Sequence, residues 1–268
     1  MSSAQADIGV IGGSGFYSLL DDAQAVEVQT PFGAPSDPIT VGRLAGRRVA
    51  FLPRHGADHR FAPHLVPYRP NLWALRSLGV RQVVALSAVG SLRADQGPGV
   101  MVVPDQLVDR THGRAQTYVD AARGVVHVPF ADPYCAVGRA AALSDPSLGA
   151  VDGGTLVVVN GPRFSTRAES QELQRNGWSI IGMTGMPEAT LARELALCYT
   201  ALALVTDLDA GVEAGEGVTH AEVLAQFAAN LPRLRELLVA TVSRLPEVPG
   251  ECECGHVYDA VPPPFALP

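Results

Sequence analysis

The sequence predicts an α/β protein that folds as a single domain. Apolar, β-branched segments alternate with segments that carry helix start and stop signals along most of the chain. The 268 residues are 47% hydrophobic and 18% charged, which is enough to bury a substantial core. No linker, internal repeat or low-complexity stretch divides the chain, so we expect residues 1–268 to form one domain.

The expected strands are short apolar runs, most of which end in glycine or in polar residues. They cover residues 7–13, 47–54, 81–91, 99–110, 154–164, 178–184 and 201–211. Ligands of open α/β folds bind beyond the carboxyl ends of strands, so the residues that follow each run are the first candidates for function.

The expected helices cover residues 70–79, 166–177, 187–199 and 220–245. Pro70 suits the first turn of the first helix, and Gly79 suits its C-cap. After the last helix, residues 249–268 form an irregular tail. Its `VPPPFALP` end cannot be regular structure, so it either dangles or packs as an extended strap.

Two of these helices have a marked start. Thr166 and Glu169 stand at the spacing of a capping box, and so do Thr219 and Glu222. Pro232 lies inside the last helix, where a proline removes one backbone hydrogen bond. We therefore expect this helix to be kinked or interrupted there.

The bulk composition excludes several functions. A net charge of −7 and a pI near 5.5 argue against nucleic-acid binding, because phosphate backbones need clustered cations. No apolar run reaches the roughly 18–20 residues of a membrane span, and the N-terminus lacks a signal-peptide pattern. We therefore expect a cytoplasmic protein that binds neither nucleic acid nor membrane.

Every one of the 20 Lys+Arg residues is an arginine. The absence of lysine excludes P-loop nucleotide binding, Schiff-base chemistry and pyridoxal enzymes, which all require that residue. An anion site in this chain must use arginine, histidine, hydroxyl groups and backbone N–H groups.

The chain has four cysteines, which are too few and too unevenly spaced for a disulfide framework. Three soft or borderline ligands, Cys252, Cys254 and His256, lie close together in the tail and could be part of a metal site. No fourth ligand follows nearby. We therefore expect a surface tail without a metal, and no cofactor.

An anion site is predicted at the carboxyl ends of four strands. The loop `GGSGFYS` does not have the spacing of a dinucleotide-binding loop, but its backbone and the Ser14 hydroxyl can hold one phosphate. Arg54, His55, Ser87 and Thr184 follow three further strands. Each has an ordinary explanation on its own, whereas together they indicate an oxyanion site built without lysine.

Asp207 and Asp209 end the apolar run `ALALVTDLDAG`. Residues two apart on a strand share a face, so both carboxylates point the same way. Such a pair suits Mg²⁺, a solvated turn or a 6-aminopurine, in which one carboxyl group binds a ring nitrogen and the other accepts from the amine. Arginine and histidine at the neighbouring strand ends favour the purine over the metal.

Several motifs in one order carry a specific resemblance. They are `IGVIGGSGFY`, `TPFGAPSD`, `RHGADH`, `YRPNLWAL`, `SAVGSL`, `DQLVDRT`, `GPRFSTRAES`, `MTGMPEATLARE` and `TDLDAG`. Over roughly residues 7–245 the chain resembles the purine nucleoside phosphorylase and methylthioadenosine phosphorylase family, and most closely its methylthioadenosine branch. The resemblance implies a twisted mixed β-sheet flanked by helices.

It also implies phosphorolysis, in which inorganic phosphate displaces the purine of a nucleoside and leaves a ribose 1-phosphate. No cofactor takes part. By position, the phosphate site consists of Ser14, Arg54, His55, Ser87, Ala88 and Thr184. The nucleoside contacts are Met183 under the ribose, Phe164 against the base, Asp207 at N7 and Asp209 at the 6-amino group, with Ser165 and His220 setting specificity. His127 matches a histidine donated by a neighbouring subunit of a trimer.

The resemblance also bears on which nucleoside is cleaved. Relatives that act on 6-oxopurines carry asparagine at the position of Asp207, so aspartate favours adenine. We expect Asp207 to have a raised pKa, as an acid that acts near neutral pH requires. Where methylthioadenosine phosphorylases have a small apolar residue, this chain has His220. Histidine can hydrogen-bond a 5′-hydroxyl, whereas a thioether accepts only weakly. Adenosine is therefore an expected substrate beside methylthioadenosine or another 5′-deoxyadenosine, unless His220 is only a solvated residue at a helix start.

Two other functions are weighed against this one. A nucleosidase would use water in place of phosphate and would not need the anion site. A non-catalytic nucleoside- or phosphate-binding protein would keep that site without needing Asp207.

Overall fold

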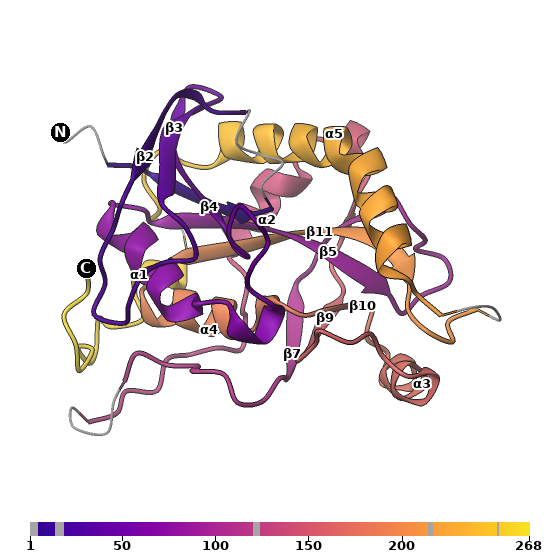
Figure 1. Ribbon diagram of the computed structural model, residues 1–268. Helices are drawn as coiled ribbons and strands as arrows, with labels where there is room; N and C mark the ends of the chain where they lie inside the picture. The colour runs from indigo at the N-terminus through magenta and orange to yellow at the C-terminus, as the bar shows by residue number, and fades with distance from the viewer. Residues whose placement is uncertain (1–4, 14–18, 120–123, 214–216, 251) are drawn as a thin grey trace.

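The computed structural model describes residues 5–13, 19–119, 124–213, 217–250 and 252–268 (Figure 1). They form an eleven-stranded mixed sheet flanked by helices. The strands are β1 (Ile8–Gly12), β2 (Asp21–Val26), β3 (Ile39–Leu44), β4 (Arg47–Pro53), β5 (Gln82–Ser91), β6 (Met101–Val103), β7 (Gln106–Arg110), β8 (Ala150–Asp152), β9 (Thr155–Val159), β10 (Ile180–Gly182) and β11 (Cys198–Leu208). The helices are α1 (Tyr68–Ser77), α2 (Ala136–Leu143), α3 (Arg167–Arg175), α4 (Gly185–Glu194) and α5 (His220–Arg244).

The sheet runs in the order β2-β3-β4-β1-β5-β10-β9-β7, and β11 pairs with both β5 and β6. β4, β1, β5 and β11 are parallel to one another. Their carboxyl ends therefore meet at one edge. β10 runs antiparallel to β5 and parallel to β9, which makes the sheet mixed.

Two apolar cores cover the two faces of this sheet. α1 and α4 pack on one face, and α2 and α5 pack on the other (Figure 1). β11 supplies both cores, because successive side chains of a strand point to opposite faces. Tyr199 and Ala201 belong to the first core, and Leu202 and Leu204 to the second. The fully apolar run at β11 is thus a strand buried on both sides.

Both capping boxes expected from the sequence are present at the helix N-termini. Thr166 and Thr219 are the N-caps of α3 and α5, and each forms a complete capping box with the glutamate three residues later. α5 contains Pro232 and continues past it, so the proline kinks the helix and does not interrupt it (Figure 1). No helix among the described residues is long and apolar enough to cross a membrane.

Several element boundaries differ from the expected ones. The run 99–110 forms two strands, β6 and β7, because Pro104 lies between them and cannot donate to a ladder. The helix expected over 187–199 ends at Glu194, and the chain turns at Ala196, whose φ is 52°, before β11 begins at Cys198. β2, β3, β8 and α2 were not expected.

The C-terminal tail packs against the body as a strap. Among the tail residues that the structure describes, the only regular element is a 3₁₀ turn over Glu253–Gly255. Phe265 is 8% exposed and packs against the rings of Trp73 and Tyr118. The expectation of a surface location for the tail cysteines is wrong for Cys254, which is 4% exposed.

Candidate active site

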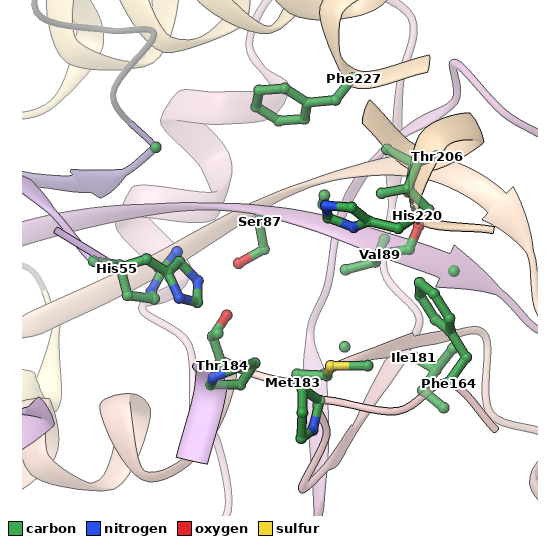
Figure 2. Close-up of a pocket in the computed structure, with 18 of the residues that line it drawn as sticks. His55, Ser87, Val89, Phe164, Ile181, Met183, Thr184, Thr206, His220 and Phe227 are labelled. Carbon is green, nitrogen blue, oxygen red and sulfur yellow. Dashed lines mark hydrogen bonds between the residues drawn. The ribbon is translucent and has the colours of Figure 1, made fainter. Parts of the chain in front are cut away.

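A cavity of about 550 Å³ lies beyond the carboxyl ends of β4, β5 and β11 (Figure 2). Segments before α3, after β10 and at the start of α5 complete its wall. The cavity brings together all but two of the residues expected at the site. Those that line it are Arg54, His55, Ser87, Ala88, Phe164, Ser165, Met183, Thr184, Asp207, Asp209 and His220.

The two exceptions differ in kind. Ser14 lies outside the described residues, although Gly13 just before it lines the cavity. His127 is exposed and is not among the lining residues of this single chain.

The direction of β10 corrects one step of the sequence argument. Thr184 was expected at the carboxyl end of a strand that runs parallel to the others. β10 is antiparallel to β5 and pairs Ile180 with Ser91 and Ile181 with Gly90. The chain therefore starts at the rim and runs back along β5, so Thr184 reaches the same end of the cavity as Ser87 (Figure 2).

Asp207 follows an irregularity in the pairing of β11 with β5. Burial raises the pKa of Asp207 to about 6, and a hydrogen bond from the Thr206 hydroxyl, 2.9 Å from Oδ2, only partly opposes this effect. A Cβ atom on Gly90 would lie 2.9 Å from Oδ1 of this carboxyl group, so only glycine leaves room beside it. The raised pKa has the expected direction for a group that donates a proton near neutral pH.

Asp209 is 4% exposed, and burial raises its pKa as well. Hydrogen bonds from the hydroxyl groups of Ser170 and Ser165 oppose this shift. One carboxyl oxygen, Oδ2, is buried and has no hydrogen-bond partner among the described residues. A buried acceptor without a partner is costly, so this atom is suited to a donor on a ligand.

The other end of the cavity carries the groups suited to an anion. The side chains of His55, Ser87 and Thr184 point into the same space (Figure 2). Thr184 precedes α4, and its hydroxyl makes no capping bond to that helix. The hydroxyl is therefore available to a ligand.

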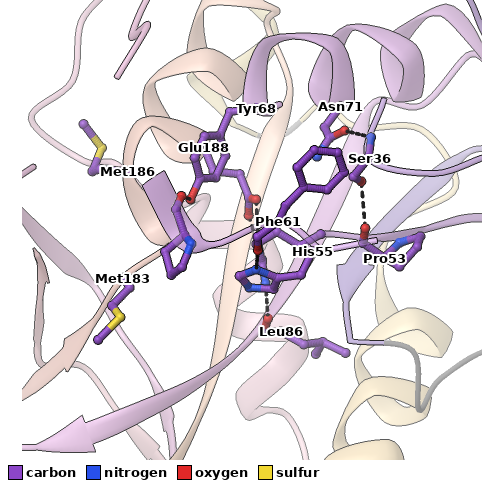
Figure 3. Close-up of polar contacts among 12 residues, drawn as sticks. Ser36, Pro53, His55, Phe61, Tyr68, Asn71, Leu86, Met183, Met186 and Glu188 are labelled. Atoms are coloured by element: carbon purple, nitrogen blue, oxygen red, sulfur yellow. Dashed lines mark hydrogen bonds and ion pairs between the residues drawn. The ribbon is translucent and has the colours of Figure 1, made fainter. Parts of the chain in front are cut away.

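His55 is held in its neutral form. Burial and the nearby positive charge of Arg54 lower the pKa of His55 to about 4, although its hydrogen bond to the carbonyl of Phe61 acts in the other direction. Nδ1 lies 2.8 Å from that carbonyl oxygen (Figure 3). Since a carbonyl only accepts, Nδ1 carries the hydrogen and Nε2 is the acceptor nitrogen of the ring.

Apolar side chains also line the cavity. Phe164 and Ile181 lie on the side of Thr206, the residue before Asp207, and Phe227 reaches in from α5 (Figure 2). His220, Val223, Leu224 and Phe227 follow helical spacing, so one face of α5 forms a wall of mixed character.

Comparison with known proteins assigns the family. A family model described as phosphorylase superfamily matches residues 7–243. The chain belongs to the phosphorylase superfamily. Its resemblance to nucleoside phosphorylases and the enzyme class inferred from it are thereby confirmed.

Individual relatives of this phosphorylase have two different names. A purine nucleoside phosphorylase of Streptomyces coelicolor is 58% identical over 100% of this chain and 99% of the relative. An S-methyl-5′-thioadenosine phosphorylase of Mycolicibacterium smegmatis is also 58% identical, over 97% of this chain and 99% of the relative. A solved methylthioadenosine phosphorylase from an antarctic soil metagenomic library is 38% identical, covers 95% of this chain and 91% of its own, and has a TM-score of 0.87.

Arg54 is held in place by a buried partner that the sequence analysis did not identify. Arg54 is 3% exposed and donates from Nε and Nη2 to the two carboxylate oxygens of Glu188, each at 2.8 Å. It also donates from Nη1 to the carbonyl of Leu86 at 2.7 Å. Burial tends to lower the pKa of Arg54, but Glu188 outweighs this and raises it above its ordinary value. The hydroxyl of Tyr199 donates to the same carboxylate at 2.8 Å.

Two motifs that carried the resemblance brace this strand end. Ser36, from `TPFGAPSD`, is fully buried and donates its hydroxyl to the carbonyl of Pro53 at 2.7 Å (Figure 3). Its backbone N–H donates to Oδ1 of Asn71, from `YRPNLWAL`, at 2.8 Å. Pro53 immediately precedes Arg54, so these bonds hold the backbone in place at the end of β4, next to Arg54.

Proposed function

We propose that this phosphorylase cleaves 6-aminopurine nucleosides with inorganic phosphate, giving adenine and a ribose 1-phosphate. Adenosine and 5′-deoxy-5′-methylthioadenosine are the proposed substrates. No cofactor takes part, and phosphate is the co-substrate.

The observation that carries the proposal is the pair of aspartates beside one apolar wall. The buried, unpartnered Oδ2 of Asp209 is suited to accept from an exocyclic amine. Asp207, whose pKa is raised to about 6, is suited to hydrogen-bond a ring nitrogen and to give it a proton as negative charge develops there. A 6-aminopurine presents both features side by side, with N7 next to the amine.

At the other end, phosphate meets a set of donors and one acceptor. Two of the five N–H groups of Arg54 remain after its bonds to Glu188 and Leu86. Ser87 and Thr184 add hydroxyl donors, and the resemblance adds Ser14 and Ala88. Nε2 of neutral His55 can accept the hydrogen of monohydrogen phosphate, which orients its charged oxygens toward the sugar.

In the reaction, the bond from C1′ to the purine nitrogen breaks, and a bond from C1′ to a phosphate oxygen forms. The purine keeps the electron pair of the broken bond, and a proton from Asp207 neutralises it. The phosphate dianion stabilises the positively charged sugar before it attacks, so the two polar ends act on opposite sides of C1′.

The side chains of α5 that line the cavity are suited to bind nucleosides with either of two 5′ substituents. His220 can hydrogen-bond a 5′-hydroxyl, while Val223 and Phe227 offer apolar contacts to a methylthio group. Solved relatives from Schistosoma mansoni are described as an adenosine/methylthioadenosine phosphorylase, and one holds adenine. Dual specificity is therefore proposed for this chain.

The functional unit is proposed to be a trimer in the cytoplasm, with His127 reaching the cavity of a neighbouring subunit. The exposure of His127, together with 68% exposure of the nearby Val125, supports this arrangement, because a partner would cover both.

The deciding experiment is phosphate-dependent base release from adenosine, methylthioadenosine and inosine, by wild type and by His220→Val. Adenosine should be cleaved, and the substitution should shift the ratio of kcat/KM toward methylthioadenosine by about tenfold. A preference for inosine would contradict the role of the aspartates, and base release without phosphate would indicate a nucleosidase. An unchanged ratio in His220→Val would make His220 a helix-start residue only.

A further inference from the structure

All four cysteines of the chain meet at one place. Their sulfur atoms, from Cys135, Cys198, Cys252 and Cys254, lie within 4.8 Å of one another. Three separate segments supply them: the residue before α2, the first residue of β11 and the C-terminal tail. None of the four is in a disulfide, and three of them are buried.

We propose that these four thiolates bind one zinc ion, which fastens the C-terminal tail to the body of the protein. In a tetrahedral zinc site with Zn–S bonds of about 2.3 Å, neighbouring sulfurs are about 3.8 Å apart. The sulfurs of Cys198 and Cys252 are 3.4 Å apart, and the whole set fits within 4.8 Å. The set is therefore within a small adjustment of that geometry.

The donor set selects the metal class. Four thiolates favour zinc or iron over magnesium, calcium and manganese, which prefer oxygen ligands. A site closed by four protein ligands leaves no position for water or substrate, which is typical of structural zinc. Binding releases the thiol protons, so the ion would replace four S–H groups by four Zn–S bonds.

The surrounding backbone already holds two of the ligands. The N–H of Cys135 donates to the carbonyl of Tyr199 at 2.8 Å, and the N–H of Cys198 donates to the carbonyl of Arg81 at 2.9 Å. Cys135 also occupies the N-cap position of α2, where the helix dipole favours a negative sulfur. These ligands belong to the rigid body of the fold, whereas Cys252 and Cys254 come from the tail.

His256, expected to contribute to a metal site, is not part of this cluster. Its Nδ1 lies 2.9 Å from Oδ2 of Asp259, and both side chains are exposed. The ligands that the sequence lacked near Cys252 and Cys254 come instead from Cys135 and Cys198, more than fifty positions earlier in the chain.

The position of the cluster points to a structural role. β11 carries Cys198 at its first residue and Asp207 near its last, so the two lie about 30 Å apart along the strand. Beyond the cysteines, the hydroxyl of Tyr258 donates to the carbonyl of Glu194 at 2.7 Å, and Phe265 packs on Trp73. An ion at the start of the strap would hold these contacts in place.

The test is metal analysis of the full-length protein purified without chelator. We expect about one zinc per chain, and thiols that react with a disulfide reagent only after a chelator removes the metal. Cys252→Ser/Cys254→Ser should lose the zinc and melt at a lower Tm. The matched control His256→Ala, which alters the same tail segment, should keep both zinc and Tm.

A second measurement covers the case in which the double variant does not fold. X-ray absorption at the zinc edge of wild type should show four sulfur neighbours at about 2.3 Å. The proposal is overturned by wild-type protein whose four thiols react freely without a metal, by a mass that reports disulfides, or by iron in the same site. Retention of zinc in the double variant would also overturn it. Because base release is measured separately, failure here leaves the proposed phosphorolysis untouched.

Discussion

At Asp207, we expect the raised pKa that serves activity to lower the stability of the fold. Its pKa rises from 3.8 to about 6 on folding, mainly through burial, so the folded state binds the proton more tightly than the unfolded state. The free energy of unfolding should therefore fall as pH rises from about 4 to about 6, and the loss should persist above that range.

Asp207→Asn should remove this cost while it removes the proton donor. We expect the variant to be more stable than wild type at pH 8, by on the order of 2 kcal/mol, with the gap closing at pH 4. Its kcat/KM for adenosine should fall by about 10²–10⁴. Urea unfolding at both pH values checks the first part, with the exposed Asp132→Asn as control. Equal stability of wild type and Asp207→Asn at pH 8 would contradict the account of this carboxyl group.

Glu188 is expected to stabilise the fold and to position Arg54, because the two side chains are buried together. Removal of one partner from a buried ion pair leaves an uncompensated charge, at a typical cost of about 3–5 kcal/mol. Glu188→Ala should therefore lower the free energy of unfolding by about that amount, and should raise the KM for phosphate because Arg54 loses two of its three anchors.

Asp95 provides the comparison for Glu188. It pairs with Arg93 at 2.7 Å, but both side chains are about half exposed or more. Exposed pairs contribute little, so Asp95→Ala should unfold close to wild type. Similar unfolding curves for Glu188→Ala and Asp95→Ala, measured in urea, would show that the buried pair does not stabilise the fold.

At the scale of single residues, the sequence predicted the groups at strand ends but not their supports. Arg54 and Asp207 follow apolar runs, so their position could be inferred from polarity alone. Glu188 stands in the middle of `MTGMPEATLARE`, where a glutamate is ordinary in a helix, and only the structure shows that it is fully buried against Arg54.

At the scale of single elements, α5 is of interest because one of its faces lines the part of the cavity in which we propose that the 5′ substituent of the nucleoside binds. Phe227 lies two turns after His220 and points into the cavity (Figure 2). Phe227→Ala should lower kcat/KM for methylthioadenosine about tenfold more than for adenosine, since a methylthio group depends on apolar contact. Phe227→Leu, which keeps most of the apolar surface, is the control. Equal losses for the two nucleosides in steady-state assays would argue that Phe227 contacts a part of the ligand that both share.

Element boundaries were predictable where a local hydrogen-bond signal exists. The capping boxes at Thr166 and Thr219 mark the start of α3 and α5, and both are formed. Between α4 and β11 the sequence `LALCYTALALV` is apolar except for Thr200, so no periodicity separates helix from strand. β2 was missed for the opposite reason, because it is an exposed strand, `DDAQAV`, held by backbone pairing to β3.

At the scale of the whole molecule, sheet topology decides what the sequence could not. A strand's neighbours depend on long-range pairing, so the antiparallel direction of β10, which brings Thr184 back to Ser87, leaves no trace in the local sequence. The same holds for the four cysteines, which are dispersed along the chain and meet only in the fold.

The proposed trimer gives a test at this scale. If His127 acts in the cavity of a neighbour, each active site combines Asp207 of one subunit with His127 of the next. A subunit with His127→Ala keeps Asp207, and a subunit with Asp207→Asn keeps His127, so the two variants can complement each other in a mixed trimer. Each variant alone should show strongly reduced base release. Random 1:1 trimers formed by co-expression should regain about one quarter of wild-type activity, because one site in four then combines an intact Asp207 with an intact neighbouring His127.

Separately purified variants that are mixed without subunit exchange are the control, and they should show only the sum of their residual activities. A co-expressed pair that shows no more than this sum would place His127 in its own subunit's site or outside the reaction. Sedimentation of the wild-type protein would then show whether the proposed trimer forms at all, since a monomer excludes any contribution from a neighbour, whereas a trimer with no recovery excludes only that of His127.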